Sequence, residues 1–359
     1  MDIILKTVMR KDMKKILISA LEPSANLHLE PILDRLEDFS IKGIFDPKFA
    51  DPLYPSSDFS VMGFVDVIGK IRMAKRAIKE MVELSFECES VLLIDSPAFN
   101  LPLAKAIKEK NPTVKIIYYI LPQVWAWKRK RVAKVERYCD DLASILPFES
   151  RYYNKSEYVG HPLLDEIKEF KQSVSNSGKV VFMPGSRRSE ISSLMRIYKE
   201  VAKELKERKI VVIPRHFSKE QIDELYGDLS DFEVTNDASK ALYEADFAFV
   251  CSGTATLEAS LIGTPLVLSY KAKKIDYFIA KRFVKLKYIG LSNIILDFEG
   301  EEPIHSEYLQ EDVTKNNLLR EYRELDREKF LEKSKKLRTI LKHGSAKRVA
   351  ELCYNNAKI

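Results

Sequence analysis

Short apolar runs alternate along this chain with charged stretches in which apolar residues recur at spacings of three and four. The positions of Ile71, Ala74, Ile78 and Met81 illustrate the second pattern, which is typical of an amphipathic helix. Eight apolar runs lie at residues 16–18, 91–94, 116–120, 142–146, 180–182, 210–213, 247–250 and 266–268. Strands that alternate with helices in this way predict an α/β fold with parallel sheets that carry helices on both faces.

A polar stretch at residues 168–179 interrupts the alternation, and a new apolar run begins directly after it. The chain has 359 residues, which exceeds the length at which a single hydrophobic core stops growing. We therefore predict two α/β domains, at residues 1–170 and 171–335. The helical pattern at residues 336–359 either caps the second domain or crosses back onto the first.

The composition excludes several classes of protein. With 45% hydrophobic and 31% charged residues, the chain is neither disordered nor fibrous, and its 12 glycines show no collagen period. Its four cysteines lie far apart without a CxxC pair, which argues against a disulfide scaffold or a zinc site. A net charge of +6 favours anionic partners such as phosphate, lipid headgroups or nucleic acid, without choosing among them.

The chain carries no signal for membrane insertion or export. No apolar stretch reaches the roughly 18 to 20 residues that span a bilayer. Residues 1–15 have too short an apolar stretch for a signal peptide and lack a small-residue cleavage site. We therefore expect a cytoplasmic protein with reduced thiols.

Two small-residue turns in the second half of the chain are suited to bind phosphate. Ser186 and Arg187 follow Gly185 after one apolar run, and a helical pattern begins directly afterwards. Backbone N–H groups at a helix start attract anions, and a guanidinium offers a fork of donors to phosphate. The alternative is a plain strand-to-helix turn with Arg187 facing solvent.

The second of these turns consists of Ser252, Gly253 and Thr254, and Glu258 follows about one turn inside the next helix. We expect the Glu258 carboxylate to accept hydrogen bonds from ribose hydroxyls, although a first-turn Glu is also favoured by the helix dipole alone. Together the two turns predict a site for a nucleoside diphosphate. Neither turn matches GxxxxGK[ST] or GxGxxG, which disfavours ATP hydrolysis and dinucleotide binding.

Candidate catalytic carboxylates follow two strands of the first half. Asp95 stands at the end of the run at 91–94, before a turn with Pro97, where it is placed for a general base or for a helix N-cap. Glu22 follows the first run and is either catalytic or a turn residue. A loop further on contains Trp125 and Trp127, which either wall a sugar or acyl chain or pack inside the domain.

Two basic amphipathic stretches, at residues 68–82 and 271–287, fit an anionic membrane surface. Each is equally consistent with the solvated face of a helix that packs on the core. The basic run at residues 128–131 is not accompanied by a nucleic-acid-binding motif, so we expect no nucleic-acid partner.

Seven short motifs occur along the chain in this order: F-S-V-M-G-F at 59–64, I-D-S-P-A-F-N at 94–100, P-Q-V-W-A-W at 122–127, L-P-F-E at 146–149, G-H-P at 160–162, P-G-S-R at 184–187 and S-G-T-A at 252–255. In sequence and order they resemble the lipid A disaccharide synthase family, over about residues 13 to 350. The resemblance implies a GT-B glycosyltransferase, with two Rossmann-like domains whose parallel sheets face each other across a cleft. It implies transfer of 2,3-diacylglucosamine from UDP to 2,3-diacylglucosamine 1-phosphate (lipid X), with release of UDP.

The resemblance assigns the first domain to the acceptor and its lipid and the second domain to the UDP-sugar. The implied catalytic residues are Asp95, as the base that takes the acceptor hydroxyl proton, and Glu22. The residues expected to bind UDP are Ser186, Arg187, Ser252, Gly253, Thr254, Glu258, Asn293 and Gln310, the last two by resemblance alone. The residues expected to face the acceptor or its lipid are Ser24, Met62, Ile71, Ile78, Trp125 and Trp127.

The chain departs from the family at its first strand-to-helix turn. The family pattern G-E-A-S-G-D reads L-E-P-S-A-N at residues 21–26, which retains Glu22 and Ser24 but neither glycine nor the Asp. The family's Pro before the cleft Asn is Ser292 here. These changes weaken any role assigned to the glycine backbone or to the Asp carboxylate.

We expect no metal and no cofactor, because the chain has no Asp-x-Asp and the implied mechanism is metal-independent. Acylated substrates would bring the enzyme to the anionic cytoplasmic face of the inner membrane as a peripheral protein. The alternatives are another UDP-sugar GT-B enzyme, such as a lipid-linked N-acetylglucosaminyltransferase or a UDP-N-acetylglucosamine 2-epimerase, and a non-catalytic binder of anionic lipid or nucleic acid.

Overall fold

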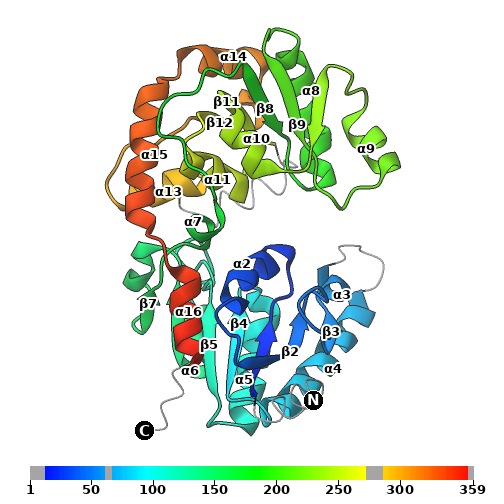
Figure 1. Cartoon of the computed structure of the whole chain (residues 1–359), viewed down its shortest axis with the longest axis vertical. Coiled ribbons are helices and arrows are strands. Elements are labelled where there is room, and N and C mark those ends of the chain that lie inside the picture. The colour runs from blue at the N-terminus through cyan, green and yellow to red at the C-terminus, as the bar shows by residue number, and fades with distance from the viewer. Residues whose placement is uncertain (1–12, 61–66, 272–285, 355–359) are drawn as a thin grey trace, which may run out of the picture. The chain divides into compact units, whose positions relative to one another are not determined.

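The computed structural model describes residues 13–60, 67–271 and 286–354, and the chain folds as two compact units (Figure 1). Unit 1 comprises Met1–Glu166 and His343–Ile359, and unit 2 comprises Ile167–Lys342. The expected division at residue 335 falls inside a continuous helix, and the chain instead passes from unit 2 to unit 1 at Lys342, which has a positive φ of 37°.

Unit 1 is built on a seven-stranded sheet in which all the described strand pairs are parallel, in the order β3-β2-β1-β4-β5-β6-β7. The strands are β1 (Lys14–Ser19), β2 (Phe39–Phe45), β3 (Tyr54–Pro55), β4 (Ser90–Ile94), β5 (Lys115–Tyr119), β6 (Asp141–Ser144) and β7 (Ser156–Tyr158). The helices are α2 (Pro23–Leu33), α3 (Ser57–Ser60), α4 (Val67–Ser85), α5 (Pro97–Lys110), α6 (Arg131–Tyr138), η3 (Pro147–Arg151), α7 (Pro162–Glu166) and α16 (Ser345–Tyr354).

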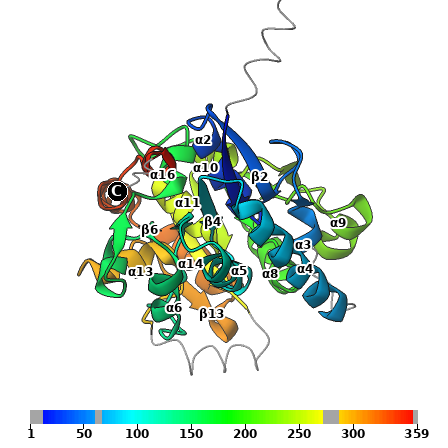
Figure 2. The same ribbon diagram turned by 90° about the horizontal axis from the view of Figure 1, so that it is seen from below.

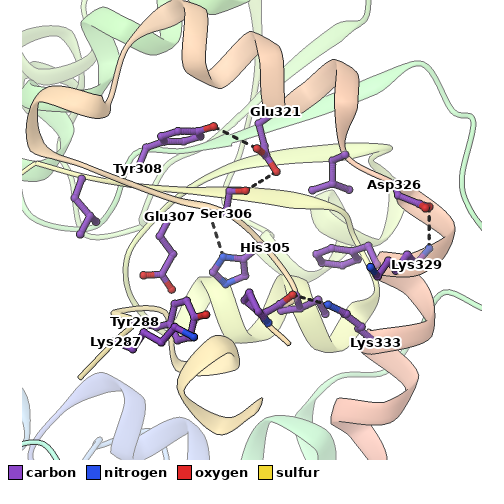
Figure 3. A pocket seen from close by; sticks show the side chains of 15 residues that line it. Lys287, Tyr288, His305, Ser306, Glu307, Tyr308, Glu321, Asp326, Lys329 and Lys333 are labelled. Carbon is purple, nitrogen blue, oxygen red and sulfur yellow. Dashed lines mark hydrogen bonds between the residues drawn. The ribbon is translucent and has the colours of Figure 1, made fainter. Parts of the chain in front are cut away.

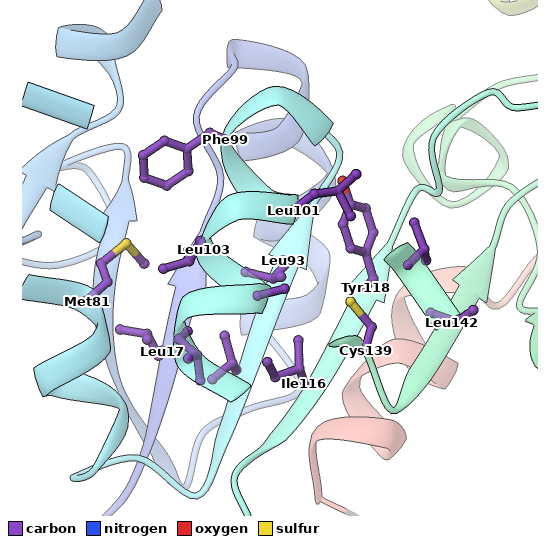
Figure 4. Packing of buried hydrophobic residues seen from close by; sticks show 14 of the residues in the cluster. Leu17, Met81, Leu93, Phe99, Leu101, Leu103, Ile116, Tyr118, Cys139 and Leu142 are labelled. Carbon is purple, nitrogen blue, oxygen red and sulfur yellow. The ribbon is translucent and has the colours of Figure 1, made fainter. Parts of the chain in front are cut away.

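One face of this sheet packs against α4 and α5. Leu17, Leu93 and Tyr118 project from three neighbouring strands toward Met81 of α4 and Leu103 of α5, and all five side chains are buried (Figure 4). Because successive residues of a strand point to opposite faces, their neighbours in sequence form a second cluster on the other side.

The opposite face is covered by α2 and by the last helix of the chain. Ile18 and Leu92 pack there with Leu29 of α2 and with Val349 and Cys353 of α16. Seen from below, α2 and α16 lie on one side of β4, and α4 and α5 lie on the other (Figure 2). The strands of unit 1 are therefore buried on both faces, as their uninterrupted apolar runs predicted.

Unit 2 is built on a six-stranded sheet, again with all described pairs parallel, in the order β10-β9-β8-β11-β12-β13. The strands are β8 (Lys179–Met183), β9 (Arg208–Val212), β10 (Phe232–Thr235), β11 (Phe247–Cys251), β12 (Leu266–Tyr270) and β13 (Glu307–Leu309). The helices are α8 (Arg188–Ala202), α9 (Lys219–Tyr226), α10 (Ala238–Glu244), α11 (Thr254–Ile262), α13 (Leu291–Phe298), η4 (Gln310–Asp312), α14 (Lys315–Glu324) and α15 (Arg327–Leu341).

Aromatic packing holds the centre of unit 2 together. Phe182 of β8 stacks on Phe249 of β11, with 5.0 Å between the ring centroids, and Tyr198 of α8 lies against both. Polar side chains fix the starts of the surrounding helices. Asp237 and Asp326 accept N-cap hydrogen bonds from the third residues of α10 and α15, respectively.

Candidate active site

In unit 1, two carboxylates meet at the carboxyl edge of the sheet. Strands β1 and β4 are parallel neighbours, so the residues that follow them lie at the same edge. Glu22 follows β1 and Asp95 follows β4, and the hydroxyl of Ser96 donates a hydrogen bond of 3.4 Å to Glu22 Oε1. The structure thus brings together the two side chains that the sequence analysis proposed as catalytic.

The backbone at Asp95 adopts an unusual conformation. Asp95 and Ser96 both have left-handed φ angles, of 49° and 43°, which cost a non-glycine residue energy. Two buried partners hold this turn in place, because Tyr118 Oη and Asn100 Nδ2 donate to the Asp95 carbonyl oxygen at 2.7 and 2.8 Å. Strained backbone maintained by its surroundings is characteristic of functional sites.

The surroundings of Asp95 also change its acidity. Burial raises the pKa of the Asp95 carboxyl, and the negative charge of Glu22 raises it further. The backbone N–H of Ser96 and the charge of His28 act in the opposite direction. A carboxylate with a raised pKa is a stronger base than one in open water, so this group is suited to take a proton from a hydroxyl.

Asn26 stabilises the altered loop at residues 21–26 in the absence of both family glycines. Its Nδ2 donates to the carbonyl oxygens of Ala20 and Glu22 at 3.0 and 2.9 Å, and its Oδ1 accepts from the N–H of Asp46 at 2.8 Å. Pro23 occupies the first turn of α2, where a missing N–H costs nothing. Asn26 therefore fixes the loop that carries Glu22 and Ser24.

The side chains expected to face the acceptor or its lipid divide into two groups. Ile71 and Trp127 are exposed, and Trp127 carries Lys128 Nζ over its ring at 4.0 Å. By contrast, Ile78 packs against the core of unit 1, and Trp125 packs edge-on against Phe148 with 5.5 Å between ring centroids. Both side chains are half-buried, so their expected contact with the acceptor or its lipid stays a prediction.

Ser24 is half-buried in the first turn of α2, whereas Met62 lies outside the described residues. Residues 272–285, which make up most of the second basic stretch, also lie outside the described part of the chain.

In unit 2, the two small-residue turns lie side by side because β8 and β11 are parallel neighbours. Gly185 has a φ of 106°, and a Cβ atom at this position would lie 2.6 Å from Glu190 Oε2 and 3.1 Å from Cys251 Sγ. Glycine is thus required both by the backbone and by the close approach of the second turn.

Arg187 is anchored on a buried carboxylate. Its Nη1 lies 2.9 Å from Glu190 Oε1, and Glu190 Oε2 accepts from the Arg187 backbone N–H at 3.3 Å. The side chain of Glu190 is 9% exposed, whereas that of Arg187 is 67% exposed. The carboxylate thus orients one side of the guanidinium, and its remaining donors face solvent beside Ser186.

The turn after β11 presents the start of a helix. Gly253 is the N-cap residue of α11 and supplies no side-chain cap, so the N–H groups of Thr254 and Ala255 are placed for a ligand, whereas that of Thr256 donates to the Gly253 carbonyl oxygen. Ser252 and Thr254 border this position. Glu258, one turn further on, accepts a short hydrogen bond from the hydroxyl of Ser239 near the start of α10.

A cavity that the sequence analysis missed opens at the ends of β9 and β10, on the same edge of the sheet. It has a volume of about 250 Å³, and most of its wall is apolar, with three polar residues, Arg215, Thr235 and Asn236. The other lining residues are Ile213, Pro214, Phe217, Ile222 and Val234. The signal in the sequence was the turn at residues 213–217, which joins a strand end to a helix as the other two turns do.

Asn293 lies inside unit 2 and is fully buried. Its Nδ2 donates to His305 O at 2.9 Å and to Glu307 Oε1 at 2.8 Å, and its Oδ1 accepts from the N–H of Ile304 at 2.9 Å. Both the Nδ2 and the Oδ1 atoms of Asn293 thus bond to partners inside unit 2. The expected direct contact of this side chain with UDP is therefore wrong. Asn293 instead holds α13 to the segment that leads into β13.

That segment also lines a larger cavity, of about 630 Å³, beside β13 (Figure 3). Ser306 and Tyr308 both donate to Glu321 there, and Lys333 donates to the carbonyl oxygen of Pro303. Gln310 follows β13 directly, with a φ of 54°, and thus lies at the carboxyl edge of the sheet.

Within residues 13–60, 67–271 and 286–354, no group of three or more His, Cys, Asp or Glu side chains is placed to hold a metal ion. Over the same residues, no helix is long and apolar enough to cross a bilayer.

The lipid-A-disaccharide synthetase family matches residues 16–355, which is nearly the whole chain. The chain belongs to this family. It is 49% identical to the lipid-A-disaccharide synthase of Campylobacter jejuni, over 95% of this chain and 99% of that protein. It is 50% identical to the enzyme of the same name from Helicobacter pylori strain G27, over 94% of this chain and 97% of that protein.

Solved structures with low sequence identity share the fold. Acinetobacter baumannii MurG is 14% identical, with a TM-score of 0.58 over 95% of this chain and 99% of that chain. The UDP-GlcNAc 2-epimerase of Methanocaldococcus jannaschii is 13% identical, with a TM-score of 0.58 over 95% and 99%. These likenesses and the two parallel sheets confirm the predicted GT-B class.

Membership of the lipid-A-disaccharide synthetase family also confirms the predicted enzyme class. The chain is a glycosyltransferase of lipid A disaccharide formation, and its substrates are a UDP-sugar and a lipid X-type acceptor. The non-catalytic alternative is thereby set aside.

Proposed function

We propose that this lipid-A-disaccharide synthetase transfers 2,3-diacylglucosamine from UDP to 2,3-diacylglucosamine 1-phosphate, with Asp95 as the base. The observation that carries the assignment is the Asp95 turn, where a strained backbone presents a partly buried carboxylate beside Glu22. Asp95 takes the proton of the acceptor hydroxyl while its oxygen attacks the anomeric carbon, and UDP departs from the other side. Burial and the negative charge of Glu22 raise the pKa of Asp95, which strengthens it as a base.

Unit 2 supplies the positive charge that the departing UDP needs. Arg187 and the helix starts of α8 and α11 face the position that the two adjacent turns leave for the diphosphate. Glu258 accepts a hydrogen bond from Ser239, which follows the cavity residue Asn236 by three positions, and this placement suits the ribose. The apolar walls of that cavity suit a flat base, and its polar residues, Arg215, Thr235 and Asn236, suit the base's edge.

The proposed acylated substrates also explain why unit 1 exposes apolar side chains beside basic ones. Trp127 and Ile71 are exposed, and Lys128 and Arg131 lie over the Trp127 ring at 4.0 and 5.5 Å. An exposed indole surrounded by basic groups matches the interface of an anionic bilayer. Unit 1 therefore meets the acceptor at the cytoplasmic face of the inner membrane, as a peripheral contact.

The test is transfer by purified protein, with products identified by mass spectrometry. UDP-diacylglucosamine and lipid X should give the disaccharide 1-phosphate, whereas unacylated UDP-N-acetylglucosamine should give neither a disaccharide nor an epimer. Absence of the acylated disaccharide contradicts the proposed reaction.

Replacing the base tests its role separately. We expect Asp95→Asn to lower kcat by at least about 100-fold, because a positioned base contributes about 10² to 10⁴ in rate. Its UDP affinity should stay within about twofold of that of the unchanged protein. Glu30→Gln, on the neighbouring helix and exposed, is the matched carboxylate control and should retain full activity. A D95N enzyme with substantial turnover would remove Asp95 as the base.

A further inference from the structure

The carbonyl oxygen of Asp95 lies at the centre of a buried hydrogen-bond network in unit 1. It accepts from Tyr118 Oη at 2.7 Å and from Asn100 Nδ2 at 2.8 Å. Asn100 Nδ2 also donates to the Ile94 carbonyl oxygen at 3.2 Å, and Asn100 Oδ1 accepts from the hydroxyl of Ser19 at 2.6 Å. The side chains of Ser19, Asn100 and Tyr118 are fully buried. Water therefore does not compete for these bonds, and each is stronger than it would be on the surface.

The network joins three neighbouring strands to the helix that follows the Asp95 turn. Ser19 ends β1, Ile94 ends β4 and Tyr118 lies in β5, and these strands are adjacent in the sheet in the order β1-β4-β5. Asn100 stands in the first turn of α5, which begins two residues after Asp95. The backbone of Asp95 is therefore held by strands and a helix, which fix a group more precisely than a loop does.

Both peptide groups that flank the Cα atom of Asp95 are hydrogen-bonded. In the preceding group, the Ile94 carbonyl accepts from Asn100, and the Asp95 N–H donates to a main-chain carbonyl of β5 at 2.9 Å. In the following group, the Asp95 carbonyl accepts its two bonds, and the Ser96 N–H donates to the Asp95 carboxylate. Because φ and ψ relate these two planar groups, holding both of them fixes the direction of the Cα–Cβ bond.

The conformation of the turn is unfavourable without these bonds. Asp95 and Ser96 both have left-handed φ angles, which cost a non-glycine residue energy. If the bonds to the Asp95 carbonyl were lost, the turn would relax toward right-handed or extended backbone, and the carboxylate would move with it. A displacement of about 1 Å at a reacting group can cost about 100-fold in rate. The network is thus placed to affect catalysis through geometry.

The chemistry of the two donors suits this task. Burial raises the pKa of the Tyr118 hydroxyl well above its ordinary value, so this group keeps its proton and remains a donor. The orientation of the Asn100 amide is also unambiguous. A main-chain carbonyl can only accept, so the atom that faces Ile94 and Asp95 must be Nδ2, and Oδ1 is left to accept from Ser19.

We propose that Tyr118 and Asn100 are positioning residues for the transfer reaction, which hold the Asp95 backbone in the conformation that presents its carboxylate to the acceptor hydroxyl. The inference rests on the proposed role of Asp95 as the base. Both side chains are fully buried, so neither is placed to contact a substrate. Their contribution therefore belongs to kcat and not to the binding of either substrate.

Two neighbouring tyrosines provide the test. Tyr118→Phe removes the hydroxyl that donates to Asp95 and keeps the ring in its apolar cluster (Figure 4). Tyr119→Phe is the matched control, because the Tyr119 side chain is equally buried but lies on the other face of the sheet, where its hydroxyl is bonded to Ser345. The network does not use this side chain.

We expect Y118F to lower kcat by roughly 10- to 30-fold and to leave both KM values within about twofold. Y119F should keep its kcat, although both variants should lose stability in denaturant unfolding. A merely structural role for Tyr118 would lower the stability of both proteins and the kcat of neither. A Y118F enzyme with the kcat of Y119F would therefore overturn the inference.

Two further variants test the route by which the network acts. Ser19→Ala removes the hydroxyl that orients the Asn100 amide and should lower kcat by less than Y118F does. An unchanged kcat in S19A would remove Asn100 from the proposal. In a D95N background, Y118F should lower the residual turnover by less than about twofold, because Tyr118 acts through Asp95. A full additional loss in this double variant would contradict that route.

A readout without turnover distinguishes this inference from the proposed function. In protein labelled with ¹³C and ¹⁵N at aspartate, the backbone signals that disappear in D95N belong to Asp95. The Cα chemical shift depends on φ and ψ, so these signals should move in Y118F and stay in place in Y119F. If D95N keeps its activity, the proposed base is wrong, whatever Y118F does. If D95N is inactive and the Asp95 signals stay in place in Y118F, the inference alone is refuted.

Discussion

Arg187 and Arg188 are adjacent in sequence, yet they form different kinds of ion pair. Arg187 is held by Glu190, whose side chain is 9% exposed, whereas Arg188 pairs with Glu224, whose side chain is 64% exposed. A surface pair of the second kind contributes little energy because water and salt screen it. The first kind fixes a guanidinium in one orientation, as a diphosphate requires.

This contrast gives a prediction with a built-in control. We expect Arg187→Ala to weaken UDP binding by roughly 10- to 100-fold, the range for losing a charge-assisted hydrogen bond of about 1.5 to 3 kcal/mol. Arg188→Ala should change the affinity by less than about twofold. Isothermal titration calorimetry with UDP measures both, and equal losses in the two variants would refute the assignment.

Several side chains that the sequence analysis proposed for the site follow directly from strand ends. Glu22 and Asp95 come after strands of unit 1 and Arg187 after a strand of unit 2, and within each sheet parallel strands bring such residues to one edge. His28 and Glu166, whose side chains form a hydrogen bond, could not be paired in this way, because nothing in the local pattern relates residues 138 positions apart. Their contact depends on α7 packing against α2.

Burial of individual side chains was harder to predict than position. Trp125 and Trp127 are two residues apart in one loop, and only Trp127 is exposed, because Phe148 from a distant segment covers Trp125. Asn293 follows the family motif, yet its amide points inward to Glu307. In each case the partner that decides the orientation comes from elsewhere in the chain.

Among the elements, the adjacent turns after β8 and β11 depend on Gly185. An alanine there would adopt an unfavourable φ, and its Cβ would displace the Glu190 carboxylate that orients Arg187. We expect Gly185→Ala to cost about 2 to 4 kcal/mol of stability and to weaken UDP binding as R187A does. Denaturant unfolding and UDP titration measure the two effects.

The matched control for this substitution is Gly300→Ala. Gly300 also has a positive φ, of 75°, but nothing lies within 4 Å of its Cβ position. We expect G300A to cost only the backbone strain, about 1 to 2 kcal/mol, without a change in UDP affinity. A G185A protein that binds UDP normally would show that the Glu190 contact does not matter for the site.

The strands that the sequence analysis found are those with the most apolar surroundings. Every one of the eight predicted runs is a strand, and these runs form the central strands of both sheets. The missed strands are β2 and the four edge strands β3, β7, β10 and β13. An edge strand is covered on fewer sides, so it can be short and polar, as Phe232–Thr235 is, and it leaves little periodic signal.

At the scale of the whole molecule, unit 1 is made from two segments separated by all of unit 2. The second segment contributes α16, which buries Val349, Ala350 and Cys353 against α2 and the sheet. Without this helix, one face of the sheet loses part of its cover. The stability of unit 1 therefore depends on residues that lie far from the rest of it in sequence.

Deleting residues 343–359 should unfold unit 1 and spare unit 2. The loss of five buried side chains of α16 corresponds to roughly 5 to 10 kcal/mol, which is comparable to the total stability of a domain. Hydrogen exchange should show lost protection in β1 and β4 and retained protection in β8 and β11. Leu337→Ala, in the core-facing part of α15, is the reciprocal control and should weaken unit 2. If the deletion caused an equal loss of hydrogen-exchange protection in units 1 and 2, this result would contradict the division of the chain into two separately folding units.

The late position of α16 also matters while the chain is being made. A ribosome adds about 5 to 20 residues per second, so synthesis of residues 167–342 separates the strands of unit 1 from their last helix by roughly 10 to 35 seconds. During that interval, Ile18 and Leu92 lie on a sheet face whose cover is incomplete. The nascent protein thus presents an apolar surface that a chaperone can recognise, until the final helix emerges and closes it.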